Sequence, residues 1–204
     1  PSRLIESARM VYGAAMDTLW GDILPAPADR VRVLQDNESV TIGNTTVTAW
    51  DTPGHARHHH AYVIGDVCFP GDVPGMRLQG CVYIPVTAAP PQFDPDEYVK
   101  SVQRLRAASF SRLYLTHFGE VRDAEAHLTA YEARIGKVAA CVKSSFDRGD
   151  TDEATQTFFR DAEHAVATPS GLSEEMRRIY EQGNGTAMCA DGIRLYWQKK
   201  IAVK

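Results

Sequence analysis

The sequence predicts an α/β (α+β) fold, in which short β-strands come first and long helices follow. Three observations support this prediction. Apolar residues alternate with polar ones between turn signals over residues 30–72, as in strands. From Leu128 to Phe146 apolar residues recur at every third or fourth position, as on a helix. In three places, a side chain that can bind a metal ion stands just after an expected strand.

Composition and charge are those of an ordinary globular protein. The chain has 204 residues, of which 44% are hydrophobic and 24% charged, and this suits one domain with a real core. A formal net charge of −4 argues against nucleic-acid or anionic membrane partners. No apolar run approaches the roughly 20 residues that a membrane span needs. The four cysteines form no C-x-x-C pair, so we expect reduced, structural thiols in a cytoplasmic protein.

The N-terminal part shows neither a signal-peptide hydrophobic region nor an initiator methionine. We therefore expect the sequence to come from a longer or processed protein. Residues 3–20 carry apolar side chains at near-helical spacing, which predicts one helix or two short ones. Gly21 and the Pro25-Ala26-Pro27 stretch end this pattern.

Short strands are expected next. The runs that alternate or are rich in β-branched residues are 31–33, 40–42, 47–49, 61–64 and 67–69. Gly43-Asn44 and Gly65-Asp66 separate neighbouring runs and are typical of tight hairpin turns. The segment therefore predicts two successive β-hairpins.

A proline-rich loop from Ile84 to Pro95 leads to the first long helix. Asp94 is placed to cap this helix, with Pro95 at its first position and Glu97 at the capping-box position. Three apolar residues then share one helix face, namely Tyr98, Val102 and Leu105. A short buried strand is expected at 113–116.

The rest of the chain is helical by pattern. One long stripe ends at Gly149 and consists of Leu128, Tyr131, Ile135, Val138, Val142 and Phe146. Shorter helices are expected around 152–163 and 173–182. The pattern over 188–203 fits either a helix or a strand.

Three strand ends carry the residues of greatest chemical interest. Thr-Pro-Gly-His ends at His55, Phe-Pro-Gly-Asp ends at Asp72, and Leu-Thr-His ends at His117. Glycine permits backbone angles that let a loop double back, and strand-end loops commonly hold functional side chains. Imidazole and carboxylate ligands suit zinc, iron and manganese.

These three motifs resemble, in the same order, those of the metallo-β-lactamase superfamily. The resemblance covers residues 1–120 and implies an αββα sandwich, here its second half, with 121–204 as a helical extension packed on the same domain. It also implies two divalent metal ions, zinc being favoured over iron or manganese. His55 and His117 would each bind one ion, and Asp72 would bridge both as the catalytic carboxylate.

The sequence departs from this family in one respect. The upstream His-x-His-x-Asp-His motif is absent, and no other segment replaces it. We therefore expect an incomplete sequence that binds metal poorly and is inactive alone. Related proteins often carry a histidine that matches His59, which would orient a metal-binding carboxylate or be an ordinary strand residue. We expect His127 and His164 to be structural or solvated.

The resemblance implies that the complete protein is a metallo-hydrolase, whose metal-bound hydroxide attacks an ester, thioester or lactone-like bond of a small molecule. Two alternatives are a non-catalytic binding module with a degenerate metal site and a di-iron redox member of the same fold. The segment 74–93 would line the substrate pocket or pack as a surface loop, and no substrate-binding residue can be assigned. The C-terminal helix stripe would serve as a lid or as the face of a homodimer.

Overall fold

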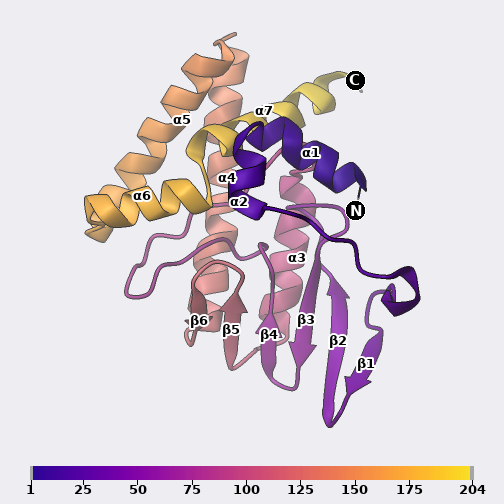
Figure 1. Cartoon of the computed structure of the whole chain (residues 1–204). Helices are drawn as coiled ribbons and strands as arrows, with labels where there is room; N and C mark the ends of the chain where they lie inside the picture. Colours follow the sequence, from indigo (N-terminus) through magenta and orange to yellow (C-terminus); the bar gives the residue numbers. More distant parts are fainter. Residues whose placement is uncertain (1, 203–204) are drawn as a thin grey trace. The chain divides into compact units, whose positions relative to one another are not determined.

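The computed structural model describes residues 2–202 (Figure 1). Its internal contacts divide the chain into two units, Pro1–Leu34 and Gln35–Lys204. The first unit contains α1 (Ser2–Tyr12), α2 (Ala15–Trp20) and a 3-10 helix, η1 (Ala28–Arg30). The helical pattern over 3–20 thus corresponds to two short helices, separated at Gly13, whose positive φ of 51° suits glycine.

The expected strand at 31–33 is wrong. Val31 has extended backbone angles, but the segment belongs to no sheet, and the first strand begins at Ser39. Val31 is 56% exposed and Val33 75% exposed. Alternation of apolar residues produces a strand only where a neighbouring strand and a buried face are available.

The second unit is built on a six-stranded sheet in the order β1-β2-β3-β4-β5-β6. The strands are β1 (Ser39–Ile42), β2 (Thr45–Asp51), β3 (His60–Ile64), β4 (Val67–Phe69), β5 (Arg112–Leu115) and β6 (Gly119–Val121). All neighbours are antiparallel except β4 and β5, which are parallel. Both predicted hairpins are confirmed, whereas β6 was not predicted.

The helices of the second unit are α3 (Pro95–Ala107), α4 (Ala124–Asp147), α5 (Asp152–Ala167), η2 (Thr168–Ser170), α6 (Glu174–Gly183) and α7 (Thr186–Ala202). The long helix and the two shorter ones are confirmed, and the described part of 188–203 is helical. Helices α3 and α4 pack together along the sheet (Figure 1), where Leu113 of β5, Val102 of α3 and Leu128 of α4 share one core. Helix α7 packs on α4 and α5.

The start of α3 is hydrogen-bonded to the loop that carries His55. Asp94 caps the helix as expected, because its side chain accepts hydrogen bonds from two backbone N–H groups of the first turn. The reciprocal bond of a capping box is not formed, since the Glu97 carboxylate pairs with Lys100 at 2.7 Å. The Asp94 N–H instead donates to the carbonyl of Gly54 at 2.9 Å.

Two further expectations concern thiols and membranes. The four cysteines, Cys68, Cys81, Cys141 and Cys189, are free, and all but Cys141 are buried. Within residues 2–202, no helix is both long and apolar enough to cross a membrane.

Candidate metal centre

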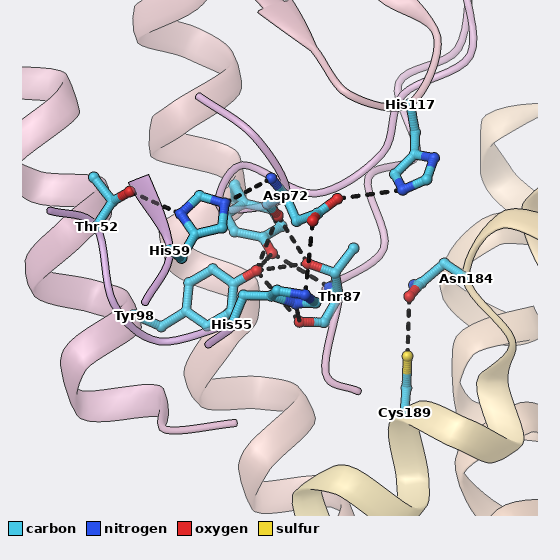
Figure 2. A network of polar contacts seen from close by, with 10 residues as sticks. Thr52, His55, His59, Asp72, Thr87, Tyr98, His117, Asn184 and Cys189 are labelled. Atoms are coloured by element: carbon cyan, nitrogen blue, oxygen red, sulfur yellow. Dashed lines mark hydrogen bonds and ion pairs between the residues drawn. The ribbon is translucent and has the colours of Figure 1, made fainter. Parts of the chain in front are cut away.

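Three strands that run in the same direction bring the candidate ligands to one edge of the sheet. Strands β2 and β4 are both antiparallel to β3, and β5 is parallel to β4. The carboxyl ends of β2, β4 and β5 therefore lie at the same edge. His55, Asp72 and His117 each follow one of these ends, and Figure 2 shows the dashed contacts that join their side chains.

The carboxylate of Asp72 lies between the two imidazole rings. Its Oδ2 is 3.7 Å from Nε2 of His55, and its Oδ1 is 3.2 Å from Nε2 of His117. Two ligands of one tetrahedral zinc ion, each about 2.1 Å from the metal, lie about 3.4 Å apart. Each carboxylate oxygen therefore has nearly the spacing from one histidine that two ligands of the same ion would have.

The donor types fit a divalent transition metal, but the donor number is small. Among residues 2–202, no group of three or more His, Cys, Asp or Glu side chains could hold a metal ion. This agrees with the geometry, because each carboxylate oxygen of Asp72 faces a single histidine. An ion at either position would have two protein donors, whereas zinc takes about four ligands.

The three side chains remain accessible from solvent. Their exposed fractions are 22% for His55, 27% for Asp72 and 35% for His117. Each of the three side chains is therefore in partial contact with solvent.

The ring of His55 is oriented by a backbone carbonyl. Its Nδ1 lies 3.3 Å from the carbonyl oxygen of Thr87. A ring that donates its Nδ1–H to a carbonyl keeps the Nε2 lone pair available. The hydrogen-bond network thus assigns His55 the tautomer that presents Nε2 to the carboxylate of Asp72.

His59 contacts the backbone of Asp72 and not its carboxylate. The ring Nε2 accepts the N–H of Asp72 at 3.0 Å, and Nδ1 lies 2.8 Å from Oγ1 of Thr52, to which it donates. Burial, and next the charge of His55, lower the pKa of His59 to about 4. The ring is therefore neutral near pH 7, as its acceptor role requires.

The contact between Asp72 and His117 lowers the pKa of Asp72 and raises that of His117. Burial raises the pKa of the Asp72 carboxyl, but the hydrogen bond from His117 and the charges of both neighbouring histidines outweigh burial and lower it below the usual value. The hydrogen bond to Asp72 raises the pKa of His117. In this arrangement Asp72 is an ionised acceptor over the whole neutral range.

Two glycines of the strand-end motifs are required by close approaches. Gly54 has a φ of 131°, and a Cβ there would lie 2.4 Å from Cα of Tyr98. Gly71 has a φ of 62°, and a Cβ there would lie 2.4 Å from Nε2 of His59. Glycine thus allows one loop to contact α3 and the other to contact His59.

The remaining histidines, His58, His60, His127 and His164, lie outside the group of candidate ligands. His60 pairs with Asp51 across β2 and β3, with 2.8 Å between Nε2 and Oδ1. His58 and His164 are exposed. His127 is buried, and its Nε2 lies 2.8 Å from the carbonyl of Pro74, so its role is structural.

The segment 74–93 belongs to the core and is not a surface loop. Met76 is 0% exposed, Val86 2% and Phe93 3%. Helix α6 holds it through Tyr180, whose hydroxyl donates to the carbonyl of Tyr83 at 2.9 Å. That this segment also lines a substrate pocket stays a prediction.

Three buried hydroxyl groups next to the candidate ligands were not recognised as site residues in the sequence. They belong to Thr87, Tyr98 and Tyr131, which are joined by hydrogen bonds. The periodicity placed both tyrosines on buried helix faces, and it said nothing about their hydroxyls. Because the three residues come from different elements, no spacing along the chain indicates that they meet.

A curated relative shares part of the sequence, although no family model matches the chain. The relative is a metallo-β-lactamase fold-containing protein, ST1585 of Sulfurisphaera tokodaii. It is 35% identical over 102 residues, which are 50% of this chain and 38% of the relative. The segment matched in sequence thus spans well under half the length of this relative.

Solved structures show the same fold. The archaeal metallo-β-lactamase superfamily protein ST1585 from Sulfolobus tokodaii aligns with 95% of this chain and 63% of its own, with a TM-score of 0.61 and 22% identity. A β-lactamase domain protein from Burkholderia ambifaria aligns over 96% and 55%, with a TM-score of 0.57 and 15% identity. The metallo-β-lactamase family protein TTHA1429 from Thermus thermophilus aligns over 82% and 48%, with a TM-score of 0.56 and 14% identity.

The matched structures, the curated relative and the strand-end motifs lead to the same assignment. The described residues form a mixed α/β structure with the sheet and helices of the metallo-β-lactamase fold. The chain thus has the metallo-β-lactamase fold and, over half of its length, is similar in sequence to a protein of that fold.

Proposed function

We propose that this chain supplies part of the active centre of a metal-dependent hydrolase. His55 and His117 would each bind one divalent ion, and Asp72 would bridge the two. The observation that carries the proposal is that the two carboxylate oxygens of Asp72 face the Nε2 atoms of two different histidines. A carboxylate that bridges two ions needs this arrangement.

Divalent ions at such a centre supply Lewis acidity, which activates water and stabilises negative charge that develops on a carbonyl. Other residues of the chain orient the donor atoms of His55 and Asp72. The Thr87 carbonyl directs Nε2 of His55 toward Asp72, and His59 holds the Asp72 peptide. The lowered pKa of Asp72 keeps its carboxylate ionised, so both oxygens are available as donors.

The substrate that we propose is a small ester, thioester or lactone. The accessible donors of His55, Asp72 and His117 support access by a small molecule. A phosphodiester backbone is less favoured, because the net charge is −4 and nucleic-acid binding needs a basic surface. Zinc is the ion that we favour, since it accepts both imidazole and carboxylate ligands.

Activity at such a centre requires more ligands than these three residues provide. We propose that water and residues beyond this donor set complete the coordination of both ions. The chain alone would then bind metal more weakly than a complete centre and show little hydrolysis. The alternative is a non-catalytic binding module, and the small number of donors within residues 2–202 favours it.

Metal titration of the chain tests the proposal. Zn²⁺ and Co²⁺ are titrated into the metal-free chain in competition with a chromophoric chelator, and hydrolysis is followed on thioester and lactone panels. We expect Asp72→Asn to lower metal affinity by at least about 100-fold, more than loss of an outer contact would. His164→Ala, which changes an exposed histidine, is the matched control. Equal affinities of Asp72→Asn and the parent chain would refute the metal centre, and tight binding without hydrolysis by the complete protein would favour the binding module.

A further inference from the structure

We infer that three buried hydroxyl groups, those of Thr87, Tyr98 and Tyr131, form a positioning network that holds His55 and Asp72 in one arrangement. Figure 2 shows Thr87 and Tyr98 beside these two candidate ligands. This inference rests on the proposed function, because metal binding is the property that the network would tune. None of the three hydroxyls would be a metal ligand. They would act through the backbone and ring contacts of the two ligands.

The hydrogen bonds form a ring through Thr87, Tyr131 and Tyr98, and one further bond leads from Thr87 to Asp72. The N–H of Thr87 donates to the Tyr131 hydroxyl at 3.3 Å, and this hydroxyl donates to that of Tyr98 at 2.8 Å. The Tyr98 hydroxyl lies 2.6 Å from Oγ1 of Thr87. Oγ1 of Thr87 in turn donates to the carbonyl of Asp72 at 2.8 Å. The single proton of the Tyr98 hydroxyl has three acceptors within reach, namely Thr87 Oγ1 at 2.6 Å, the Asp72 carbonyl at 3.0 Å and the Thr87 carbonyl at 3.3 Å.

Thr87 is the residue that joins the two ligands. Its carbonyl oxygen lies 3.3 Å from Nδ1 of His55, and its Oγ1 bonds to the carbonyl of Asp72. The Tyr98 hydroxyl lies 3.0 Å from the same Asp72 carbonyl. His59 holds the N–H of Asp72 at 3.0 Å. Both peptide groups that flank the Cα of Asp72 are therefore fixed, and its carboxylate is directed at the two histidines.

Burial makes this arrangement specific. Tyr98 and Tyr131 are 0% exposed and Thr87 is 4% exposed. A buried hydroxyl that loses its partner leaves another group unsatisfied, so each bond supports the next. Valine in place of Thr87, or phenylalanine in place of either tyrosine, would fill nearly the same space without these hydrogen bonds. The hydroxyls therefore orient the neighbouring groups in addition to packing against them.

The network links the site to helices that carry none of the candidate ligands. Tyr98 lies on α3 and Tyr131 on α4, and Thr87 lies in the segment between β4 and α3. The backbone next to Thr87 has a further hydrogen bond, because the Asn184 side chain donates to the carbonyl of Val86 at 3.2 Å. The packing of these helices thus sets the positions of the donor atoms.

The test measures metal affinity in variants that keep side-chain shape. Thr87→Val removes Oγ1, and Tyr131→Phe removes the link between the Thr87 N–H and Tyr98. With Zn²⁺ and Co²⁺ alone as probes, we expect Thr87→Val to bind about 10- to 100-fold more weakly than the parent chain, as losses of outer contacts do. We expect Thr87→Ser to restore affinity and Tyr131→Phe to show a smaller loss. The visible absorption spectrum of the bound Co²⁺ should differ from that of the parent chain most in Thr87→Val and less in Tyr131→Phe.

Thr155→Val is the matched control. Thr155 is also buried, at 1% exposure, and its hydroxyl contacts Ser145 at 3.0 Å and Arg194 at 3.1 Å. This variant should lose thermal stability but keep the metal affinity of the parent. If it lost as much affinity as Thr87→Val, the effect would be general destabilisation, and the inference would be wrong.

Other outcomes separate the network from the metal centre itself. Unchanged affinity in Thr87→Val, with Asp72→Asn impaired, would overturn the network and leave the metal centre standing. Unchanged affinity in Asp72→Asn would overturn both. If Thr87→Val did not fold, as judged by thermal unfolding without metal, Tyr131→Phe would decide, and parental affinity in that variant would overturn the network.

Discussion

The strand-end loops and the segment 74–93 contribute to the same candidate centre in different ways. The loops supply all three candidate ligands, each within a few residues of a strand end. The segment has no helix or strand and supplies no ligand, yet its Thr87 contacts both His55 and Asp72. The identity of a ligand is thus a local property of the chain, whereas its orientation depends on packing from distant elements.

The largest effect is expected where α7 meets this segment. A Cβ on Gly192 would lie 1.8 Å from the carbonyl oxygen of Ala88, next to Thr87. Because a backbone atom cannot move aside easily, Gly192→Ala should lower the free energy of unfolding by about 3 kcal/mol. It should also weaken metal binding, since the shift reaches Thr87. Urea unfolding and metal titration measure the two effects.

A second helical glycine provides the control for this prediction. A Cβ on Gly136 of α4 would meet nothing within 4 Å, so Gly136→Ala should stabilise the chain by about 0.5–1 kcal/mol. Similar stabilities and metal affinities for the two variants would show that the contact between α7 and the segment does not constrain the site.

An intermediate effect concerns pH and the buried His127, which holds the carbonyl of Pro74 close to Asp72. Burial, with a smaller contribution from the charge of Arg77, lowers the pKa of His127 from 6.5 to about 4, although the hydrogen bond to the Pro74 carbonyl and the charge of Asp123 act in the opposite direction. Between these two values the unfolded chain binds a proton that the folded chain does not, so stability falls as pH falls. From pH 7 to pH 5 this residue should remove about 2 kcal/mol.

Urea unfolding at several pH values, with the parent chain beside His127→Gln, measures this contribution. Glutamine can still donate to the Pro74 carbonyl, so the variant should show a shallower loss of stability in acid. His164→Gln, at an exposed site, should follow the parent curve. Parallel curves for the parent chain and His127→Gln would disprove the prediction.

The smallest effect is expected at the start of α3. The Asp94 side chain accepts the N–H groups of Asp96 and Glu97 at 3.0 and 3.2 Å. Asp94→Ala should therefore cost about 1 kcal/mol of stability, whereas Asp94→Asn should cost less, because asparagine is also a good cap. Thermal unfolding compares the two. An equal loss in both variants would mean that the cap bonds do not stabilise α3.

Local patterns predicted most of the regular structure. The hairpins, the long α4 and the cap of α3 follow from turn residues, apolar period and a capping side chain, all of which act over a few positions. The strand at 31–33 was wrong because strand formation needs a partner strand. The end of the chain fitted both helix and strand because α7 packs on both α4 and α5, which weakens the single apolar stripe that marks an amphipathic helix.

The sequence by itself determined which ligand-type residues follow which strands, because proline, glycine and histidine act within each motif. It also indicated the superfamily through the order of those motifs. Only the tertiary structure decided that each Asp72 oxygen faces a different histidine and that Thr87, Tyr98 and Tyr131 meet beside them. The physical reason is that these contacts join residues far apart in the chain, so they depend on strand direction and on the packing of α3 and α4, which no local pattern encodes.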